Sequence, residues 1–495
     1  MTITGNYSSF PYSPSAAVKQ EEAREELPLK EKKPEAEHIA LGIDIGSTTL
    51  SFDIVDIETG RELSALTVPN DTVVPGKAYE KLYDADRVLD KVCAELERII
   101  GGSQFPRPEC IGVTGQMHGI LYVNAAGRAI SPLYSWMDGT GDEPLEALGG
   151  KSAAQFLSEL TGSRMATGMG CSTLLNHTVN GLVPAGASAV CTVADYVAMR
   201  LSGRSGPYMH SSNASSLGAF DLRSGRFMTE LLKKAGIDCS LFPNVTDGYE
   251  TAGNFRGIPV SVAIGDNQAS FFASVKDPDG AVLVNIGTGS QISFITSAPE
   301  PCPGMEVRPL AGGMRITVGS SLCGGRSLSI LEAFLRNTVR LIGGTECGSA
   351  YKGIDRYLET LMECGGEDAF RHSLKIDTCF CGTREEPWRK GSVTGIDPDN
   401  FTPEELIKGF FFGIAEELKD LYVAGGGGKP KLLVTTGGAV RKSRYLKNVL
   451  ERLFDCPASI PACIEAAAYG STVYARVAAG AEATPAMAQA KIIYD

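Results

Sequence analysis

The chain has 495 residues, more than one hydrophobic core usually supports, so its length predicts two large domains. Its net charge of −12 argues against a nucleic-acid-binding protein, because nucleic acid demands a basic surface. The same charge predicts that any bound phosphate is met locally, by backbone N–H groups and a metal ion.

The sequence also argues against a membrane or secreted protein. No apolar run reaches the about 18–20 residues that span a bilayer, and no signal peptide opens the chain, so a cytoplasmic location is expected. The 13 cysteines are irregularly spaced. Cys364, Cys379 and Cys381 could together bind a metal ion. Because no second CxxC or HxxxH set completes such a site, free thiols are favoured.

The predicted elements alternate between strands and helices. Residues 1–37 are rich in Pro and mixed charge and predict a disordered or peripheral N-terminal arm. Strands are expected at 40–46, 50–56, 62–67, 110–114 and 259–265, a helix at 84–100, and helices with loops over 151–245. A second unit is expected to open near 281 with a strand, a turn and a strand, followed by helices near 327–340 and 403–423 and a strand at 431–438.

The helix near 403 has a well-marked start. Thr402 is predicted to be its N-cap and Pro403 its first residue, with Glu405 closing a capping box. Because both halves mix strands and helices and both open with a hairpin, the pattern predicts two related α/β domains that face each other.

Two turns of similar composition follow apolar strands. "DIGSTT" contains Gly46, Ser47 and Thr48, and "NIGTGS" contains Gly287, Thr288 and Gly289. Glycine lets the backbone curl or approach an anion closely, and the hydroxyls add donors. The pattern allows two ordinary tight hairpins, or two hairpins that hold a polyphosphate from opposite sides.

Two aspartates adjoin these elements. Asp44, just before the first turn, is expected to hold Mg²⁺ through water. Asp266 follows the predicted strand 259–265 where a helix begins, so it is read either as a helix cap or as the base that accepts a proton from a substrate hydroxyl.

The segment 114–142 has the composition of a sugar site. Gln116, His118, Trp136 and Asp138 combine an amide, an imidazole, an indole and a carboxylate. Such a mixture gives a sugar one apolar face and several polar partners. Near the C-terminus, Gly437 and Gly438 separate a strand from a helix and would let a flat base lie against the backbone, although this signal alone is weak.

Together and in this order, these motifs resemble those of the FGGY carbohydrate kinases, which have the actin-like ATPase fold. The resemblance covers nearly all of residues 39–480. It implies an α/β protein with two actin-like (ribonuclease H-like) ATPase domains, at 38–273 and 274–495, that flank an interdomain cleft. It further implies ATP and Mg²⁺ as cofactors, with Asp266 as catalytic base and as a metal ligand beside Asp44.

The resemblance also assigns the remaining motifs. "TTGGA", which contains Gly437, Gly438 and Ala439, corresponds to the nucleotide-binding segment, and "GQMHG" adds Met117 to the sugar-binding residues. "MHSSNASSLGAFDL" and "TGMGCSTLLN" look closer to sedoheptulokinases than to xylulokinases. The expected reaction is ATP-dependent phosphorylation of the terminal hydroxyl of a ketose, with sedoheptulose favoured.

Three alternatives stay open. They are a xylulokinase or other pentulokinase, a non-catalytic actin-like nucleotide-binding protein and a silent sugar sensor. A homodimer is possible, whereas partners among nucleic acids and membranes are not expected.

Overall fold

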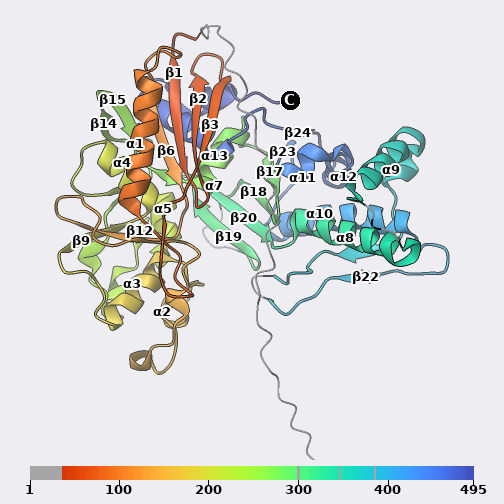
Figure 1. Cartoon of the computed structure of the whole chain (residues 1–495), viewed down its shortest axis with the longest axis horizontal. Helices are drawn as coiled ribbons and strands as arrows, with labels where there is room; N and C mark the ends of the chain where they lie inside the picture. The colour runs from red at the N-terminus through yellow and green to blue at the C-terminus, as the bar shows by residue number, and fades with distance from the viewer. Residues whose placement is uncertain (1–35, 298–301, 345, 347, 384–385) are drawn as a thin grey trace, which may run out of the picture. The chain divides into compact units, whose positions relative to one another are not determined.

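Two mixed β-sheets organise the chain in the computed structural model, which describes residues 36–297, 302–344, 346, 348–383 and 386–495 (Figure 1). The predicted N-terminal arm, 1–37, therefore lies outside the described residues apart from its last two. The first sheet consists of β1 (Ile39–Ile45), β2 (Thr49–Asp56), β3 (Glu62–Pro69), β6 (Cys110–Gly115), β14 (Thr251–Phe255), β15 (Ile258–Ser261) and β16 (Ile264–Gly265). The second consists of β17 (Ala281–Ile286), β18 (Ser290–Ile295), β19 (Met305–Pro309), β20 (Arg315–Ser321), β23 (Leu432–Thr436) and β24 (Ala458–Ser459).

The two sheets repeat one strand pattern. The first has the order β14-β15-β6-β1-β2-β3 and the second the order β19-β20-β18-β17-β23-β24. In each, the opening strand pairs antiparallel with the next (β1 with β2, β17 with β18) and parallel with a later strand (β6 or β23). The prediction of two related α/β units, each opening with a hairpin, is confirmed.

Helices and short strands complete the fold. The helices are α1 (Ala85–Gly101), α2 (Ala153–Thr161), α3 (Gly170–Val179), α4 (Val193–Leu201), α5 (Ser211–Ser216), α6 (Thr229–Lys234), α7 (Asp266–Ser274), α8 (Gly324–Gly343), α9 (Tyr351–Cys364), α10 (Pro403–Ala424), α11 (Gly438–Lys442), α12 (Arg444–Phe454), α13 (Ala466–Ala478) and α14 (Pro485–Ala490). The short strands are β4 (Val73–Val74), β5 (Leu82–Tyr83), β7 (Leu121–Asn124), β8 (Leu133–Tyr134), β9 (Ala187–Cys191), β10 (Tyr208–His210), β11 (Phe220–Asp221), β12 (Arg226–Phe227), β13 (Asn244–Thr246), β21 (Lys375–Asp377) and β22 (Ser392–Thr394). In the described part of the chain, no helix is long and apolar enough to cross a membrane.

The start of α10 confirms two of its three predicted features. Thr402 is the N-cap, its side chain accepts the N–H of Glu405, and Pro403 stands in the first turn. The predicted capping box is wrong, because the N–H of Thr402 donates to the carbonyl of Asn400. The Glu405 carboxylate instead accepts hydrogen bonds from the backbone and hydroxyl of Ser373, which a neighbouring loop supplies.

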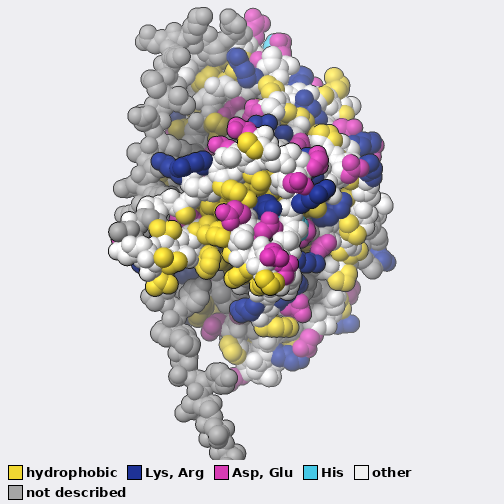
Figure 2. Space-filling view, turned by 90° about the vertical axis from the view of Figure 1, so that its right-hand side faces the viewer, with side chains coloured by type: hydrophobic (Ala, Val, Ile, Leu, Met, Phe, Trp, Pro, Cys, Tyr) yellow, Lys and Arg dark blue, Asp and Glu magenta, His cyan; other side chains and the backbone are white. Residues whose placement is uncertain are grey.

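The surface is charged but mixed in sign. Acidic and basic side chains are interspersed over the face shown in Figure 2, without a continuous basic area on it. Exposed apolar residues are concentrated on the second half of α8, where Phe334, Val339, Leu341 and Ile342 are at least half exposed. The homodimer stays a prediction.

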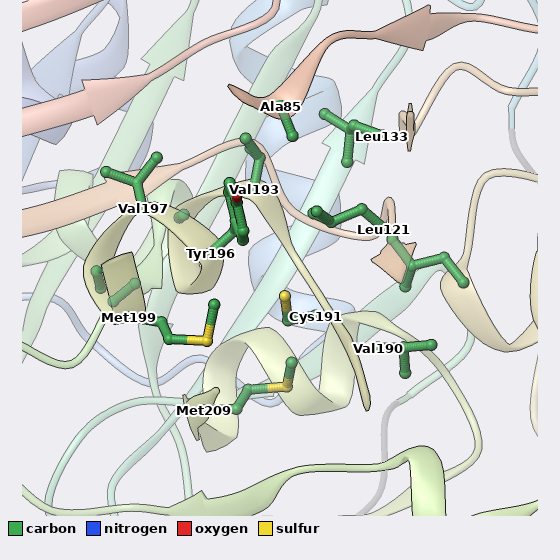
Figure 3. Packing of buried hydrophobic residues seen from close by; sticks show 14 of the residues in the cluster. Ala85, Leu121, Leu133, Val190, Cys191, Val193, Tyr196, Val197, Met199 and Met209 are labelled. Atoms are coloured by element: carbon green, nitrogen blue, oxygen red, sulfur yellow. The ribbon is translucent and has the colours of Figure 1, made fainter. Parts of the chain in front are cut away.

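The first half of the chain, which contains the first sheet, has a dense apolar core. In Figure 3, side chains from α4, including Val193 and Tyr196, lie among side chains from β7 and β9, such as Leu121 and Cys191. A second cluster fills the other half. A third contains residues of both halves, with Ala269 of α7 packed in the same cluster as Val434 of β23 and Tyr469 of α13.

Helix α13 belongs to the second half by sequence but packs against the first sheet and α7. A Cβ atom on Gly470 would lie 1.7 Å from the carbonyl oxygen of Ala269 in α7. One on Gly42 of β1 would lie 1.9 Å from the carbonyl oxygen of Ala468. Side chains at these positions would force the backbones apart. The predicted domain boundary between 273 and 274 stays a prediction, and a cut there would separate α13 from the sheet that it covers.

We expect Gly470→Ala to destabilise the protein, because the added methyl group overlaps the backbone of α7. Overpacking of this kind typically costs about 1–3 kcal/mol. Gly353→Ala on α9 is the matched control, since no atom lies within 4 Å of its Cβ position and alanine is the better helix former by about 0.5–1 kcal/mol. Thermal unfolding should show a lowered midpoint for the first variant only. An unchanged midpoint for Gly470→Ala would contradict the described contact.

Candidate active site

The first glycine-rich turn joins β1 to β2. The Gly46 N–H donates to the carbonyl of Thr49 at 2.9 Å, and the Asn70 side-chain amide donates to the Gly46 carbonyl at 2.8 Å. A Cβ on Gly46 would lie 2.9 Å from the Thr49 carbonyl oxygen, so glycine is what allows the tight curl. Thr48 at the tip is exposed. The turn is thus tightly bonded, with one hydroxyl-bearing residue exposed at its tip.

The second turn joins β17 to β18 and is held by the start of α8. Gly325 donates its N–H to the carbonyl of Gly287 at 2.8 Å, and Arg326 donates to that of Thr288 at 3.0 Å. Gly287 and Thr288 are exposed, and a Cβ on Gly289 would meet the Ser321 carbonyl oxygen at 2.7 Å. Both predicted turns thus exist as tight, glycine-dependent hairpins at equivalent places in the two sheets.

The glycine pair at the end of β23 lies beside the second hairpin, because β23 pairs with β17. Gly437 has φ +91°, and its Cβ position is 2.5 Å from the carbonyl oxygen of Ile286. Only glycine fits there. Gly438, the first residue of α11, has open space at its Cβ position. The two glycines therefore differ: the first makes the turn, and the second leaves room above the helix start, next to Ala439.

Two carboxylates act on a third, that of Asp44, near the end of β1. One carboxylate oxygen of Asp44, Oδ1, is buried and has no hydrogen-bond partner among the described residues. Burial, followed by the negative charges of Asp266 and Glu465, raises the pKa of Asp44 to about 7. Glu465 precedes α13 and accepts a bond from the hydroxyl of Ser51, the partner of Asp44 across the hairpin. The unsatisfied oxygen and the gathered negative charge suit a hard cation with oxygen ligands.

Asp266 is the first residue of α7. Its carboxylate accepts the N–H of Asn267 at 2.7 Å. The N-cap position is taken by Gly265, so the reading of Asp266 as an N-cap is wrong. Burial raises the pKa of Asp266, while the Asn267 N–H and the positive charge of Arg308 oppose the rise. The Asn267 side chain donates to Gln291 of β18 at 2.7 Å, so the helix start is tied to the second hairpin.

The first hairpin is also bonded to two predicted sugar-binding residues. The Trp136 indole donates to the Ser47 hydroxyl at 2.9 Å, and Ser47 is 3.4 Å from the side-chain oxygen of Gln116. His118 has a left-handed backbone, with φ 74°, and Ser216 of α5 holds both its N–H and its ring Nδ1. The first glycine-rich turn and the segment 114–142 are thus bonded to each other.

Asp138 departs from the sequence interpretation. It is fully buried, and its two carboxylate oxygens accept the N–H groups of Lys81 and Thr140. The carboxylate therefore holds the loop that carries Trp136, in place of the sugar contact expected from its neighbours.

A cavity of about 1250 Å³ has walls from both halves of the chain. Met117, His118 and Trp136 border it on the side of the first half, and the second half contributes Arg308 and Lys375. The residues of the two glycine-rich turns do not border it. The cavity is therefore a candidate sugar site separate from the turns.

The geometry accords with the proteins that this chain resembles. Residues 39–273 match the N-terminal domain of the FGGY family of carbohydrate kinases. The chain belongs to the FGGY family. Its members are ATP-dependent phosphotransferases, which makes this protein a carbohydrate kinase.

Individual relatives of this FGGY kinase are distant. It is 25% identical to a sedoheptulokinase of Mus musculus over 484 residues, which covers 87% of this chain and 95% of the relative. It is 26% identical to a xylulose kinase of Streptomyces rubiginosus over 274 residues, or 52% of this chain and 54% of the relative. The solved structure of xylulose kinase from Rhodospirillum rubrum has a TM-score of 0.73 at 21% identity, covering 92% and 93% of the two chains. The predicted fold of two actin-like domains is confirmed.

Sequence reasoning missed three features of this FGGY kinase site. Glu465 and Arg308 stand in no motif, and only the packing of α13 and β19 brings them near Asp44 and Asp266. Ser216 lies within "MHSSNASSLGAFDL", but the sequence gives no sign that it bonds His118. Among the described residues, no group of three or more His, Cys, Asp or Glu side chains is arranged to hold a metal directly. A cation at Asp44 and Asp266 would accordingly keep ligands from water and phosphate.

Trp136→Phe should weaken the connection between the first glycine-rich turn and the segment 114–142. The substitution keeps an aromatic ring but removes the 2.9 Å bond to Ser47, and one such bond contributes about 0.5–1.5 kcal/mol. We expect kcat/KM to fall by roughly 2- to 10-fold. Trp388→Phe is the matched control, because Trp388 is 72% exposed and lies outside the cavity wall. Equal rates for Trp136→Phe and wild type would show that the bond has no part in function.

Proposed function

We propose that this FGGY kinase transfers the γ-phosphoryl group of ATP to the terminal primary hydroxyl of a ketose, and that the ketose is sedoheptulose, which gives sedoheptulose 7-phosphate. The observation that carries the reaction type is that the negative charge of Asp266 acts on Asp44 in the first hairpin, while Asn267, next to Asp266, bonds Gln291 of the second hairpin. The choice of sugar is supported by the sedoheptulokinase relative, which matches over 87% of the chain.

The nucleotide is assigned to the hairpins and the glycine pair. Gly46 would shape the first turn, and backbone N–H groups and hydroxyls of Ser47 and Thr48 and of Gly287 to Gly289 would hold the phosphates from two sides. The open position at Gly438, beside Ala439, would take the flat base. This arrangement uses no basic side chain, which suits a chain with net charge −12.

Asp266 is assigned as the general base. In the reaction, the hydroxyl oxygen of the sugar forms a bond to the γ-phosphorus while the bond from phosphorus to ADP breaks, and Asp266 accepts the hydroxyl proton. Its contact with Asn267 and its place at the start of α7 fix the carboxylate.

Mg²⁺ fits the same place. Asp44, with one buried oxygen that lacks a partner, and Asp266 would hold the ion through water. When bound, it would supply positive charge that offsets the charge of the phosphates.

The alternatives differ in what they require. A pentulokinase would use the same machinery, and the xylulose kinase relative, matched over 52% of the chain, favours it as the second candidate. A non-catalytic nucleotide-binding protein would need the hairpins but neither a carboxylate at the start of α7 nor the cavity.

Phosphoryl transfer to a panel of ketoses tests the proposal. We expect sedoheptulose to exceed D-xylulose and D-ribulose in kcat/KM by tenfold or more, because a pocket built for a longer sugar leaves buried polar groups unpaired with a shorter one. Each such group costs about 1–3 kcal/mol. ADP release should be measured alongside NMR of the product. Equal or faster turnover of D-xylulose would overturn the choice of sugar. If the protein phosphorylates none of the ketoses, the proposal that it is a ketose kinase is overturned.

A further inference from the structure

We propose that Arg308, held by Glu306, hydrogen-bonds the hydroxyls of the bound ketose from the second half of the chain. The proposal rests on the function proposed above and adds a substrate-contacting residue that no motif marks. It makes the sugar site a joint product of the two sheets.

The guanidinium of Arg308 is fixed in place. Its Nε and Nη2 both donate to one carboxylate oxygen of Glu306, at 3.0 and 2.6 Å. The side chain is only 13% exposed. An arginine has five N–H donors in a rigid plane. Among the described residues, Glu306 accepts hydrogen bonds from two of the nitrogens of this guanidinium, Nε and Nη2. The remaining donors, on Nη1 above all, are available to a ligand.

Strand β19 carries Arg308 to the first half of the chain. β19 is the edge strand of the second sheet (Figure 1), yet it contacts α5 of the first half. The side-chain amide of Gln268, in α7, donates to the carbonyl of Pro309 at 3.0 Å, a fully buried bond. Arg308 is thereby anchored beside the helix that begins with Asp266. Its positive charge acts on that carboxylate and opposes the rise of its pKa.

The cavity indicates which substrate Arg308 meets. Glu306 and Arg308 border the same cavity as Met117, His118 and Trp136. The turns assigned to the nucleotide do not border it. A planar group with several donors suits neighbouring hydroxyls of a sugar, and burial makes such bonds worth more than they are in water. A merely structural ion pair would not need to stand in the cavity wall.

The test compares Arg308→Met with Arg308→Lys. We expect Arg308→Met to lower kcat/KM for the best ketose about 10- to 100-fold, chiefly through a raised KM, because hydrogen bonds from a charged donor are lost. Arg308→Lys should fall between this variant and wild type, since it keeps the charge but not the planar donor set. Calorimetry should give the same Kd for ADP in all three proteins.

Arg315→Met is the matched control. Arg315 stands on the neighbouring strand β20 and also bonds across to the first half, at the carbonyl of Leu222, but it does not border the cavity. Its KM for the ketose should equal that of wild type. Should Arg308→Met fail to fold, Glu306→Gln, which weakens the hold on Arg308, should raise the KM for the ketose about 3-fold or more without changing the Kd for ADP.

The outcomes separate the two proposals. If the wild-type protein phosphorylates ketoses and Arg308→Met has an unchanged KM for them, only the proposal about Arg308 is overturned. A parallel loss of ADP affinity would also overturn it, because the residue would then act on the nucleotide or on the fold. A wild-type protein that phosphorylates no ketose would overturn both proposals.

Discussion

The close packing of α13 against the first sheet and α7 determines where the site residues lie. The contact is made through backbone at Gly470 and Gly42, and a third glycine, Gly112 of β6, leaves only 2.1 Å between its Cβ position and the carbonyl oxygen of Ser471. A helix of the second half thereby covers β1, the strand that carries Asp44. Because Glu465 immediately precedes this helix, the same packing brings its carboxylate to the hairpin.

This packing concentrates negative charge where the proposed function places the phosphates of ATP. Burial, followed by the negative charges of Asp266 and Glu465, raises the pKa of Asp44 to about 7. Polyphosphate can approach such a place only where backbone N–H groups point outward and a cation offsets the carboxylates. The exposed residues Thr48, Gly287 and Thr288 leave both turns open to such a ligand. The Asp44 oxygen that has no hydrogen-bond partner among the described residues accords with the second condition. Arg308, from the opposite sheet, is the positive side chain that influences Asp266.

The sequence was informative where the cause of structure is local. The hairpins, the start of α7 and the N-cap of α10 follow from glycine, helix and capping preferences over a few residues, and each was predicted. The rest depends on partners that are distant in the chain. Glu405 was assigned to a capping box, but Ser373 takes its carboxylate. Asp138 was assigned to the sugar, but the backbone of Lys81 and Thr140 takes both oxygens. Residue type and spacing do not reveal such competition, and they gave no sign of Arg308 in the cavity wall.

The central claim is that Asp266 accepts the proton of a sugar hydroxyl, and Asp266→Asn tests it most directly. Kinetics with the best ketose should be combined with calorimetric binding of ADP and of the sugar, and Asp279→Asn, an exposed aspartate paired with Lys431, serves as control. We expect both ligands to bind Asp266→Asn with affinities near those of wild type while kcat falls by about 10²- to 10⁴-fold, the usual cost of a lost general base. A variant that binds both ligands and keeps more than roughly a tenth of the wild-type kcat would contradict the account, because that loss is well below the cost of a positioned base.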